Sequence, residues 1–276
     1  MNKINRVIMA QETLDIIEKG HYMANGQTVS VQSLLEASIH ATFTVAPSQW
    51  DGLLQTVAQT GTSSYQTTIC VQNCTTIAAL LEAKTDCKIG ILNFASAKNP
   101  GGGFQSGASA QEESLSRSSG LYATLTKDMT MYRHNRAQSS FLYSDYMIYS
   151  PQVPFWMDDE GQRFDTPILA DVITSPAPNL GAMLQHDRRA EINQVELVLE
   201  SRMEKVLALA QQQGINYLIL GAWGCGVFRN DPAMVARLFQ KTIQEKFAGI
   251  FQEIVFAVYD TSDKQVNFRA FETPFQ

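Results

Sequence analysis

Short apolar runs alternate with helical patterns along most of this 276-residue sequence, and this alternation constrains the fold more than any other feature. Each run is short and rich in β-branched or aromatic residues, as buried strands are. The six runs cover residues 67–73, 88–94, 145–150, 170–177, 216–222 and 253–259. The helical patterns cover residues 75–83, 110–125, 188–213 and 232–247. Such alternation predicts an α/β fold with a mostly parallel sheet and helices on both faces.

The segment VPFWMDDEGQRF at residues 153–164 departs from this alternation. Asp158, Asp159 and Gly161 interrupt its apolar residues as the tip of a hairpin does. The segment therefore predicts one antiparallel pairing and a mixed sheet.

The first part of the chain reads differently from the rest. Residues 6–20 form an amphipathic helical pattern, and residues 31–41 form a shorter one. Because the sequence contains no repeat and no linker-like stretch, we expect a single globular unit. Within it, residues 1–60 are predicted to be a helical extension packed on a core of residues 61–276.

The charge and the apolar segments exclude several classes of protein. The formal net charge of −6 argues against general DNA or RNA binding, although it is compatible with a local positive pocket for an anionic ligand. Glu12, Asp15 and Glu18 interrupt the region where a signal peptide needs a continuous apolar core. No apolar segment reaches the length that spans a bilayer. We therefore expect a cytoplasmic protein that does not bind membranes.

The cysteines and histidines give no metal-site pattern. Only Cys70 and Cys74 are close enough to form half a zinc site, and no second pair completes it. We expect reduced and mostly buried cysteines at positions 70, 74, 87 and 225, and we expect neither a metal nor a cofactor.

Two glycine-rich loops follow predicted strands and precede predicted helices. The triglycine loop (residues 98–109, KNPGGGFQSGAS) contains Gly101, Gly102 and Gly103, and the second glycine loop is GAWGCGVFRNDP at residues 221–232. Backbone without a Cβ can adopt positive φ and approach a ligand closely. Ligands bind at the carboxyl ends of parallel strands, where helix N-termini attract anions. The two loops predict a cleft for a phosphorylated ligand; alternatively, the glycines only permit tight turns.

Neither loop matches a common nucleotide fingerprint. The sequence has no GxxxxGK[ST], and PGGGF lacks the GxGxxG spacing of a dinucleotide turn. Asp231 and Pro232 match a helix N-cap followed by proline at the first helical position. Local patterns alone leave the ligand class open.

Two adjacent glutamates follow the triglycine loop. Ser109 and Glu112 match the S-x-x-E capping box, which predicts that Ser109 caps the helix and that Glu112 reaches back to its amide. Adjacent helical residues point about 100° apart, so we expect Glu112 and Glu113 not to share one proton. Glu113 is then available as a general acid or base. Alternatively, both carboxylates only favour the positive end of a helix.

NPGGG and QEE at residues 99–113, with GAWGCGVFRNDP downstream, closely resemble the microbial-type poly(ADP-ribose) glycohydrolases, a branch of the macrodomain superfamily. The resemblance extends over nearly the whole chain and includes SPQVPFW, DVITSPAPN and FAVYD. It implies a three-layer αβα sandwich with an ADP-ribose cleft at the strand ends. It also implies hydrolysis of the ribose–ribose bonds of poly(ADP-ribose), with that polymer or ADP-ribosylated proteins as partners and ADP-ribose as product.

The resemblance implies roles for individual residues. Glu113 is expected to be the catalytic acid, and Glu112 is expected to help hold the ribose hydroxyls beside the scissile bond. Phe228 is expected to lie near the terminal ribose, and Tyr259 to stack on the adenine. The residues expected to bind substrate are Asn99, Gly101, Gly102, Gly103, Gln111, Gly224, Cys225, Gly226, Val227, Phe228 and Tyr259.

Adenine recognition and the reaction stay open at this level. Cys74 and Thr75 stand where many macrodomains have an acidic residue that reads adenine, so we expect backbone groups or Asp260 to do so. A single-acid route is expected, because adjacent glutamates do not form the spaced carboxylate pair of ordinary glycosidases. Bulk at Gly102 is expected to intrude on the ligand. The alternatives are an ADP-ribose-binding macrodomain without activity and a hydrolase of mono-ADP-ribosylated protein.

Overall fold

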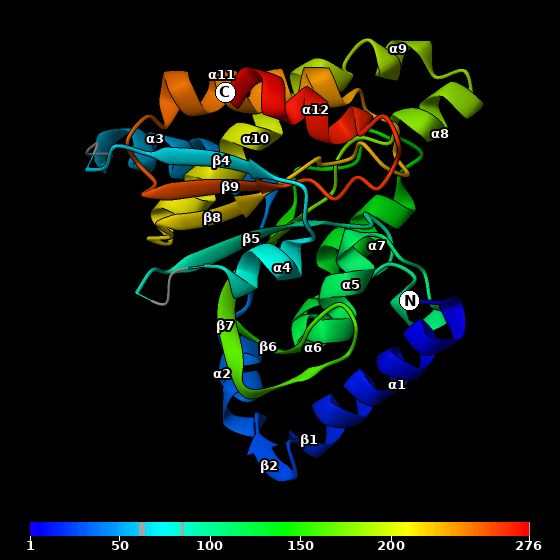
Figure 1. Ribbon diagram of the computed structural model, residues 1–276. Helices are drawn as coiled ribbons and strands as arrows, with labels where there is room; N and C mark the ends of the chain where they lie inside the picture. The colour runs from blue at the N-terminus through cyan, green and yellow to red at the C-terminus, as the bar shows by residue number, and fades with distance from the viewer. Residues whose placement is uncertain (61–63, 84–85, 276) are drawn as a thin grey trace.

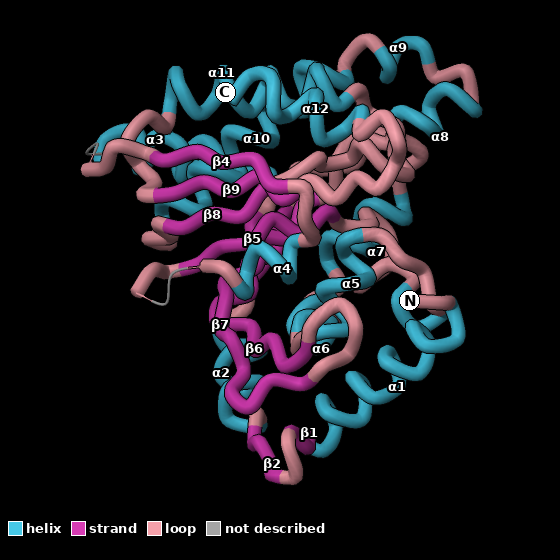
Figure 2. Tube along the Cα trace, viewed as in Figure 1, coloured by secondary structure: helices cyan, strands magenta, loops and turns pink. Residues whose placement is uncertain are grey.

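The centre of the molecule is a seven-stranded sheet (Figures 1 and 2). The computed structural model describes residues 1–60, 64–83 and 86–275. The strands of the sheet are β3 (Phe43–Val45), β4 (Thr68–Gln72), β5 (Ile89–Phe94), β6 (Met147–Met157), β7 (Arg163–Ser175), β8 (Tyr217–Leu220) and β9 (Glu253–Ala257). Their order is β3-β6-β7-β5-β8-β9-β4. From β7 to β4 all neighbours are parallel, whereas β3, β6 and β7 pair antiparallel.

The predicted strands and the predicted hairpin are confirmed. Each of the six apolar runs contains a strand or one end of a strand. The runs at 145–150 and 170–177 are the ends of two long strands, β6 and β7, which meet at a tip where the Gly161 amide donates to the Asp158 carbonyl. β8 is buried along its whole length, as a strand covered on both faces must be.

Helices cover both faces of the sheet and make a three-layer sandwich (Figure 1). One layer contains α4 (Thr76–Leu81), α5 (Gln111–Ser118), α6 (Leu121–Leu125) and α7 (Thr130–Ala137). The other contains α3 (Trp50–Thr60), α10 (Val195–Gln212), α11 (Pro232–Lys246) and α12 (Val266–Glu272). Five further short helical segments lie in the described chain: η1 (Pro47–Gln49), η2 (Phe104–Ser106), α8 (Leu180–Gln185), α9 (Arg189–Ile192) and η3 (Thr273–Phe275). Two predicted helices are wrong in their continuity: 110–125 divides into α5 and α6, and 188–213 divides into α9 and α10.

The N-terminal residues pack outside the sandwich, at the end of the β6–β7 hairpin (Figure 1). They form α1 (Lys3–Lys19), a small hairpin of β1 (His21–Ala24) and β2 (Gln27–Ser30), and α2 (Gln32–Ala41). Met9 and Ile16 of α1 share one apolar cluster with Trp156 and Met157. β3 and α3 precede residue 60 but belong to the sheet and its covering layer, so the predicted extension is only partly separate from the core.

The four cysteines all lie in the described ranges and form no disulfide, and each is half-buried, less deeply than predicted. Across residues 1–60, 64–83 and 86–275, no helix has the length and apolar character needed to cross a membrane.

Candidate active site

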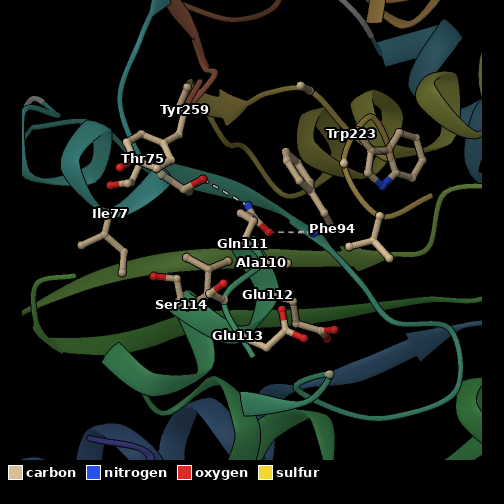
Figure 3. A pocket seen from close by; sticks show the side chains of 18 of the residues that line it. Thr75, Ile77, Phe94, Ala110, Gln111, Glu112, Glu113, Ser114, Trp223 and Tyr259 are labelled. Carbon is tan, nitrogen blue, oxygen red and sulfur yellow. Dashed lines mark hydrogen bonds between the residues drawn. The ribbon is translucent and has the colours of Figure 1, made fainter. Parts of the chain in front are cut away.

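A cavity of about 690 Å³ opens where β5, β8 and β9 end, at the carboxyl edge of the sheet (Figure 3). Its walls are the triglycine loop, the first turn of α5, the second glycine loop and the segment after β9. The sequence-predicted residues that line it are Asn99, Gly102, Gly103, Gln111, Glu112, Glu113, Gly224, Gly226, Val227, Phe228 and Tyr259. The cavity thus joins two loops that are more than 100 residues apart in the chain.

The helix that carries the two glutamates begins one residue later than predicted. Its N-cap is Ala110, which has no side-chain hydrogen bond to offer, so the predicted capping box of Ser109 and Glu112 is wrong. Glu112 is the second residue of α5 and Glu113 the third. Both carboxylates are turned instead toward the loops that precede the helix.

The Glu112 carboxylate is buried and accepts hydrogen bonds from the chain that leaves β5. Its Oε2 accepts from the Ser96 amide at 2.6 Å, and its Oε1 accepts from Asn93 Nδ2 at 3.3 Å. The Gly101 amide also donates to it. Burial raises the pKa of Glu112 to about 8, and the neighbouring charge of Glu113 acts in the same direction. Glu112 therefore fixes the start of the triglycine loop from inside the protein.

Glu113 is half-buried and reaches the same loop from the cavity side (Figure 3). Its Oε1 accepts from the Gly103 amide at 2.9 Å. A Cβ on Gly102 would lie 2.3 Å from Glu113 Oε1 and 3.2 Å from Glu112 Oε2. That the two glutamates do not share one proton stays a prediction, and both carboxylates come close to the backbone of Gly102. That residue has φ +58°, a conformation that glycine adopts without strain.

Gln111 lines the cavity, but its amide is engaged within the protein. Nε2 donates to the Leu92 carbonyl at 2.8 Å and to Thr76 Oγ1 at 3.2 Å, while Oε1 accepts from the Phe94 amide at 2.9 Å. These contacts tie the start of α5 to the end of β5. The structure gives Gln111 a positioning role, and direct contact with a ligand stays a prediction.

The rest of the triglycine loop is held by arginines from outside it. Arg6 Nε donates to the Gly107 carbonyl at 2.7 Å, and Arg117 Nη1 donates to the Ala108 carbonyl at 2.6 Å. Both arginines also line the cavity. Gly101 is buried outside the described lining, and its amide donates to Glu112. Its contact with substrate stays a prediction.

The second glycine loop is held by different contacts. Trp223 Nε1 donates to the Ser175 carbonyl at 3.1 Å, and Asn230 Nδ2 donates to the Pro178 carbonyl at 3.0 Å. Gly224 has φ +76°, and a Cβ there would lie 2.4 Å from Asn230 Nδ2. At Gly226, by contrast, a Cβ would have no described atom within 4 Å. Asp231 caps α11 and Pro232 is its first residue, as predicted.

Three residues of the second glycine loop differ in their relation to the cavity. Val227 is 78 % exposed at the rim, and the Phe228 ring lies half-buried, 6.1 Å from the ring of Tyr143. Cys225 packs against the apolar core and does not line the cavity, so the structure does not bear out its predicted contact with substrate. Burial raises the pKa of the Cys225 thiol to about 12.

Tyr259 and Asp159 line the cavity beside Thr75. Tyr259 is 64 % exposed and lies near Thr75 (Figure 3). Asp159, from the tip of the β6–β7 hairpin, accepts from Thr75 Oγ1 and Ser114 Oγ, each at 2.5 Å. The segment at residues 74–75 lacks an acidic residue, and Asp159 supplies one there from 84 positions away. No local sequence pattern links these segments, so Asp159 could not be predicted as a residue of the site.

Asp260, the expected alternative to backbone groups for reading adenine, has its carboxylate engaged within the protein. Its carboxylate accepts from the Ser262 amide and hydroxyl at 3.0 and 2.6 Å and from the Asn267 amide at 2.8 Å. These bonds fix the turn before α12, and Asp260 is absent from the described lining. Within the described ranges, no group of three or more His, Cys, Asp or Glu side chains is placed to hold a metal ion.

The sandwich, its two glycine loops and the acid-bearing helix together define a macrodomain-like fold with a glycosidase type of site. The chain belongs to the microbial-type PARG family, because the model of the microbial-type PARG catalytic domain matches residues 10–158. Among curated proteins, no match was found.

Solved structures of two bacterial poly(ADP-ribose) glycohydrolases are similar over most of their length. The enzyme from Thermomonospora curvata is 42% identical, with a TM-score of 0.91 over 98% of this chain and 99% of that one. The same enzyme bound to the inhibitor ADP-HPD gives 41% identity and a TM-score of 0.89, with the same coverage. The enzyme from Deinococcus radiodurans in complex with ADP-ribose is 43% identical, with a TM-score of 0.82 over 87% of this chain and 96% of that one.

Proposed function

We propose that this chain is a poly(ADP-ribose) glycohydrolase that releases ADP-ribose with Glu113 as its acid. The observation that carries the assignment is the position of the Glu113 carboxylate, which lies against Gly102 and Gly103 inside the cavity. Membership of the microbial-type PARG family supports the substrate. The similar enzymes solved with ADP-ribose and with ADP-HPD support the kind of ligand that the cavity accepts.

The cavity suits one ADP-ribose unit in size and in the distribution of its groups. Its 690 Å³ lies within the range of small-molecule sites, roughly 300–1,000 Å³. The second glycine loop offers backbone amides to the diphosphate, whereas the amides of Gly101, Gly102 and Gly103 donate within the protein. Tyr259 and Asp159, both beside Thr75, offer a ring face and an acceptor to the adenine, and Glu113 lies against Gly102 and Gly103. The Phe228 ring lines the same cavity, and we place the terminal ribose against it.

The reaction follows from this placement. Glu113 donates its proton to the oxygen that bridges the two riboses, and the bond between that oxygen and the anomeric carbon breaks. An oxocarbenium-like ribose forms beside Phe228 and the triglycine loop. Water, positioned by the diphosphate of the ligand, adds to the anomeric carbon, and its proton returns to Glu113. One ADP-ribose and a polymer shorter by one unit result.

Glu112 has a different part in this scheme. Its bonds to the Ser96 and Gly101 amides hold the backbone against which Glu113 is placed. We infer that Glu112 mainly holds the backbone that positions the Glu113 carboxylate. It contacts the ribose hydroxyls only through Oε2, the oxygen that lies next to Gly102. A protonated Glu112 leaves one negative charge fewer beside the diphosphate.

The experiment that tests the proposal measures release of ADP-ribose from purified poly(ADP-ribose). Wild type is compared with Glu113→Gln, which keeps an oxygen to accept from the Gly103 amide but cannot donate the proton in the same way. We expect a loss of turnover of about 10²–10⁴-fold, the usual contribution of a general acid, with ADP-ribose affinity retained. Glu18→Gln is the control, because it removes the same charge from an exposed position on α1 and should leave turnover unchanged.

Each outcome has a clear meaning. Turnover retained in Glu113→Gln would show that Glu113 is not the acid. If wild type binds ADP-ribose but releases none from the polymer, the chain is a binding module or acts on mono-ADP-ribosylated protein. A cytoplasmic location remains part of the proposal and fits the four cysteines, which form no disulfide.

A further inference from the structure

A second cavity, of about 430 Å³, lies on the other side of the triglycine loop. It shares Asn99, Gly102 and Gly103 with the first cavity, and α6 and α7 provide its far side. We propose that this second cavity receives the adenosine 5′-diphosphate part of the preceding polymer unit, an inference that rests on the function proposed above. It would then be the subsite for the leaving group.

The position of Glu113 connects the two cavities. Its carboxylate accepts from the Gly103 amide and lies against Gly102, and both glycines belong to both linings. The oxygen that takes the proton of Glu113 must therefore stand beside the partition between the cavities. The ADP-ribose to be released occupies the first cavity, so the group attached to that oxygen continues past the partition. In poly(ADP-ribose) this group is the adenosine ribose of the preceding unit.

The charge of the second cavity fits a diphosphate. Among the described residues that line it, Arg136 is the one charged side chain. Arg136 Nε donates to the Lys98 carbonyl at 2.6 Å and Nη2 lies 3.4 Å from Asn99 Oδ1, while Nη1 makes no hydrogen bond within the described chain. The first cavity, by comparison, offers no excess of positive charge, because three carboxylates and two arginines line it: Glu112, Glu113, Asp159, Arg6 and Arg117. A second anionic unit is thus better accommodated on the Arg136 side.

The remaining lining fits a nucleoside. Tyr122 is half-buried, and its ring lies 5.0 Å from that of the buried Phe104, which leaves part of the Tyr122 ring facing the cavity. Met129 adds a half-buried apolar surface. Gln105 and Ser106 offer polar groups at the exposed edge. An aromatic face with polar groups around it is the usual environment of a stacked base.

The test uses opposite charges at Gln105. Its side chain is exposed and makes no hydrogen bond within the described chain, so Gln105→Glu and Gln105→Lys should fold like wild type. A negative charge here repels the diphosphate and a positive charge attracts it. We expect the KM for poly(ADP-ribose) to rise in the first variant and fall in the second, by roughly two- to five-fold at low salt, as for exposed charge pairs. Gln55→Glu on the distant α3 is the matched control.

A second substrate separates the two cavities. The 4-nitrophenyl glycoside of ADP-ribose fills the first cavity but has only a small phenol as leaving group. The Gln105 variants should leave its KM, and the Kd of ADP-ribose, unchanged. Arg136→Gln should raise the KM for poly(ADP-ribose) more than Gln105→Glu does. Because Arg136 contacts Asn99, which lines both cavities, the Kd of ADP-ribose shows whether the first cavity has changed as well.

Three results would overturn the inference. They are an unchanged polymer KM in both Gln105 variants, a change in the same direction in both, and an equal change with the small glycoside. An equal loss of ADP-ribose affinity in Arg136→Gln would show that Arg136 acts through Asn99 and not as the cation of this subsite. A wild type that binds ADP-ribose but cleaves neither substrate would instead refute the proposed function itself.

Discussion

The two glycine loops line one cavity, but side chains of different kinds hold them in place. The triglycine loop and Ser96 just before it are bound by the glutamates proposed for the chemistry, through the Ser96, Gly101 and Gly103 amides. The second glycine loop is bound by Trp223 and Asn230, which donate to backbone carbonyls outside the loop. In the first loop, structure and catalysis thus depend on the same groups, whereas in the second they are separable.

The largest effect in this comparison is expected from Gly102→Ala. We expected bulk at Gly102 to meet the ligand, but the structure places Glu113 Oε1 only 2.3 Å from the new Cβ. The carboxylate must move, so kcat should fall by roughly 10²-fold, the lower end of a general-acid contribution. An alanine at φ +58° costs about 1–2 kcal/mol of stability. Kinetics on poly(ADP-ribose) measure the change in kcat, and urea unfolding measures the change in stability. An unchanged kcat would show that the position of the two carboxylates does not depend on the Gly102 backbone.

An intermediate effect is expected from Glu112→Gln. The pKa of Glu112 rises from 4.5 to about 8 on folding, so the folded protein holds this proton more tightly. Its contribution to stability is therefore complete below about pH 4.5 and is lost as the pH rises through about 8, at about 1.4 kcal/mol per pKa unit.

The variant lacks this titration. Urea unfolding should be measured from pH 5 to pH 9. As the pH rises, the free energy of unfolding should fall more in wild type than in Glu112→Gln. At pH 7 the variant should also lose activity, by less than Glu113→Gln, because the amide can satisfy only some of the donors around it. Parallel pH profiles for the two proteins would mean that Glu112 is not the titrating group.

The smallest effect is expected from Gly226→Ala in the second glycine loop. No described atom lies within 4 Å of the new Cβ, and the backbone there is not in the left-handed region, so the free energy of unfolding should stay within about 1 kcal/mol of wild type. The added methyl group faces the ligand space and should weaken ADP-ribose binding by about ten-fold. Gly52→Ala, equally unhindered on α3, is the control and should not change the affinity. A large loss of stability in Gly226→Ala would show that structure and ligand binding are not separable in the second glycine loop either.

The sequence predicted those parts of the molecule that short-range patterns determine. The six apolar strand segments have a strong signal of their own, and glycine runs after strands mark the loops of the cavity. The Asp231–Pro232 helix start is equally local and was predicted correctly. Even the missed hairpin of β1 and β2 carries such a signal, because Asn25 and Gly26 at its turn both have positive φ.

The parts that sequence reasoning missed depend on contacts between distant segments. Ser109 and Glu112 fit a capping box locally, yet the buried Glu112 carboxylate turns to the amide of Ser96, 16 residues away, because a buried carboxylate needs donors. Asp159 reaches Thr75 only because the hairpin folds over the sheet. β3 has three residues and gains its place from pairing with β6. Patterns within one segment carry no information about such contacts.

Asp159 also has a consequence for how fluctuations spread through the molecule. It joins the wall of the cavity to the tip of the hairpin, and Trp156 and Met157 just before it pack against α1. A ligand that orders the cavity end therefore makes local opening of the hairpin and of α1 more costly. Hydrogen–deuterium exchange should slow in the amides of α1 when ADP-ribose binds, so the N-terminal helix would report on the occupancy of the cavity.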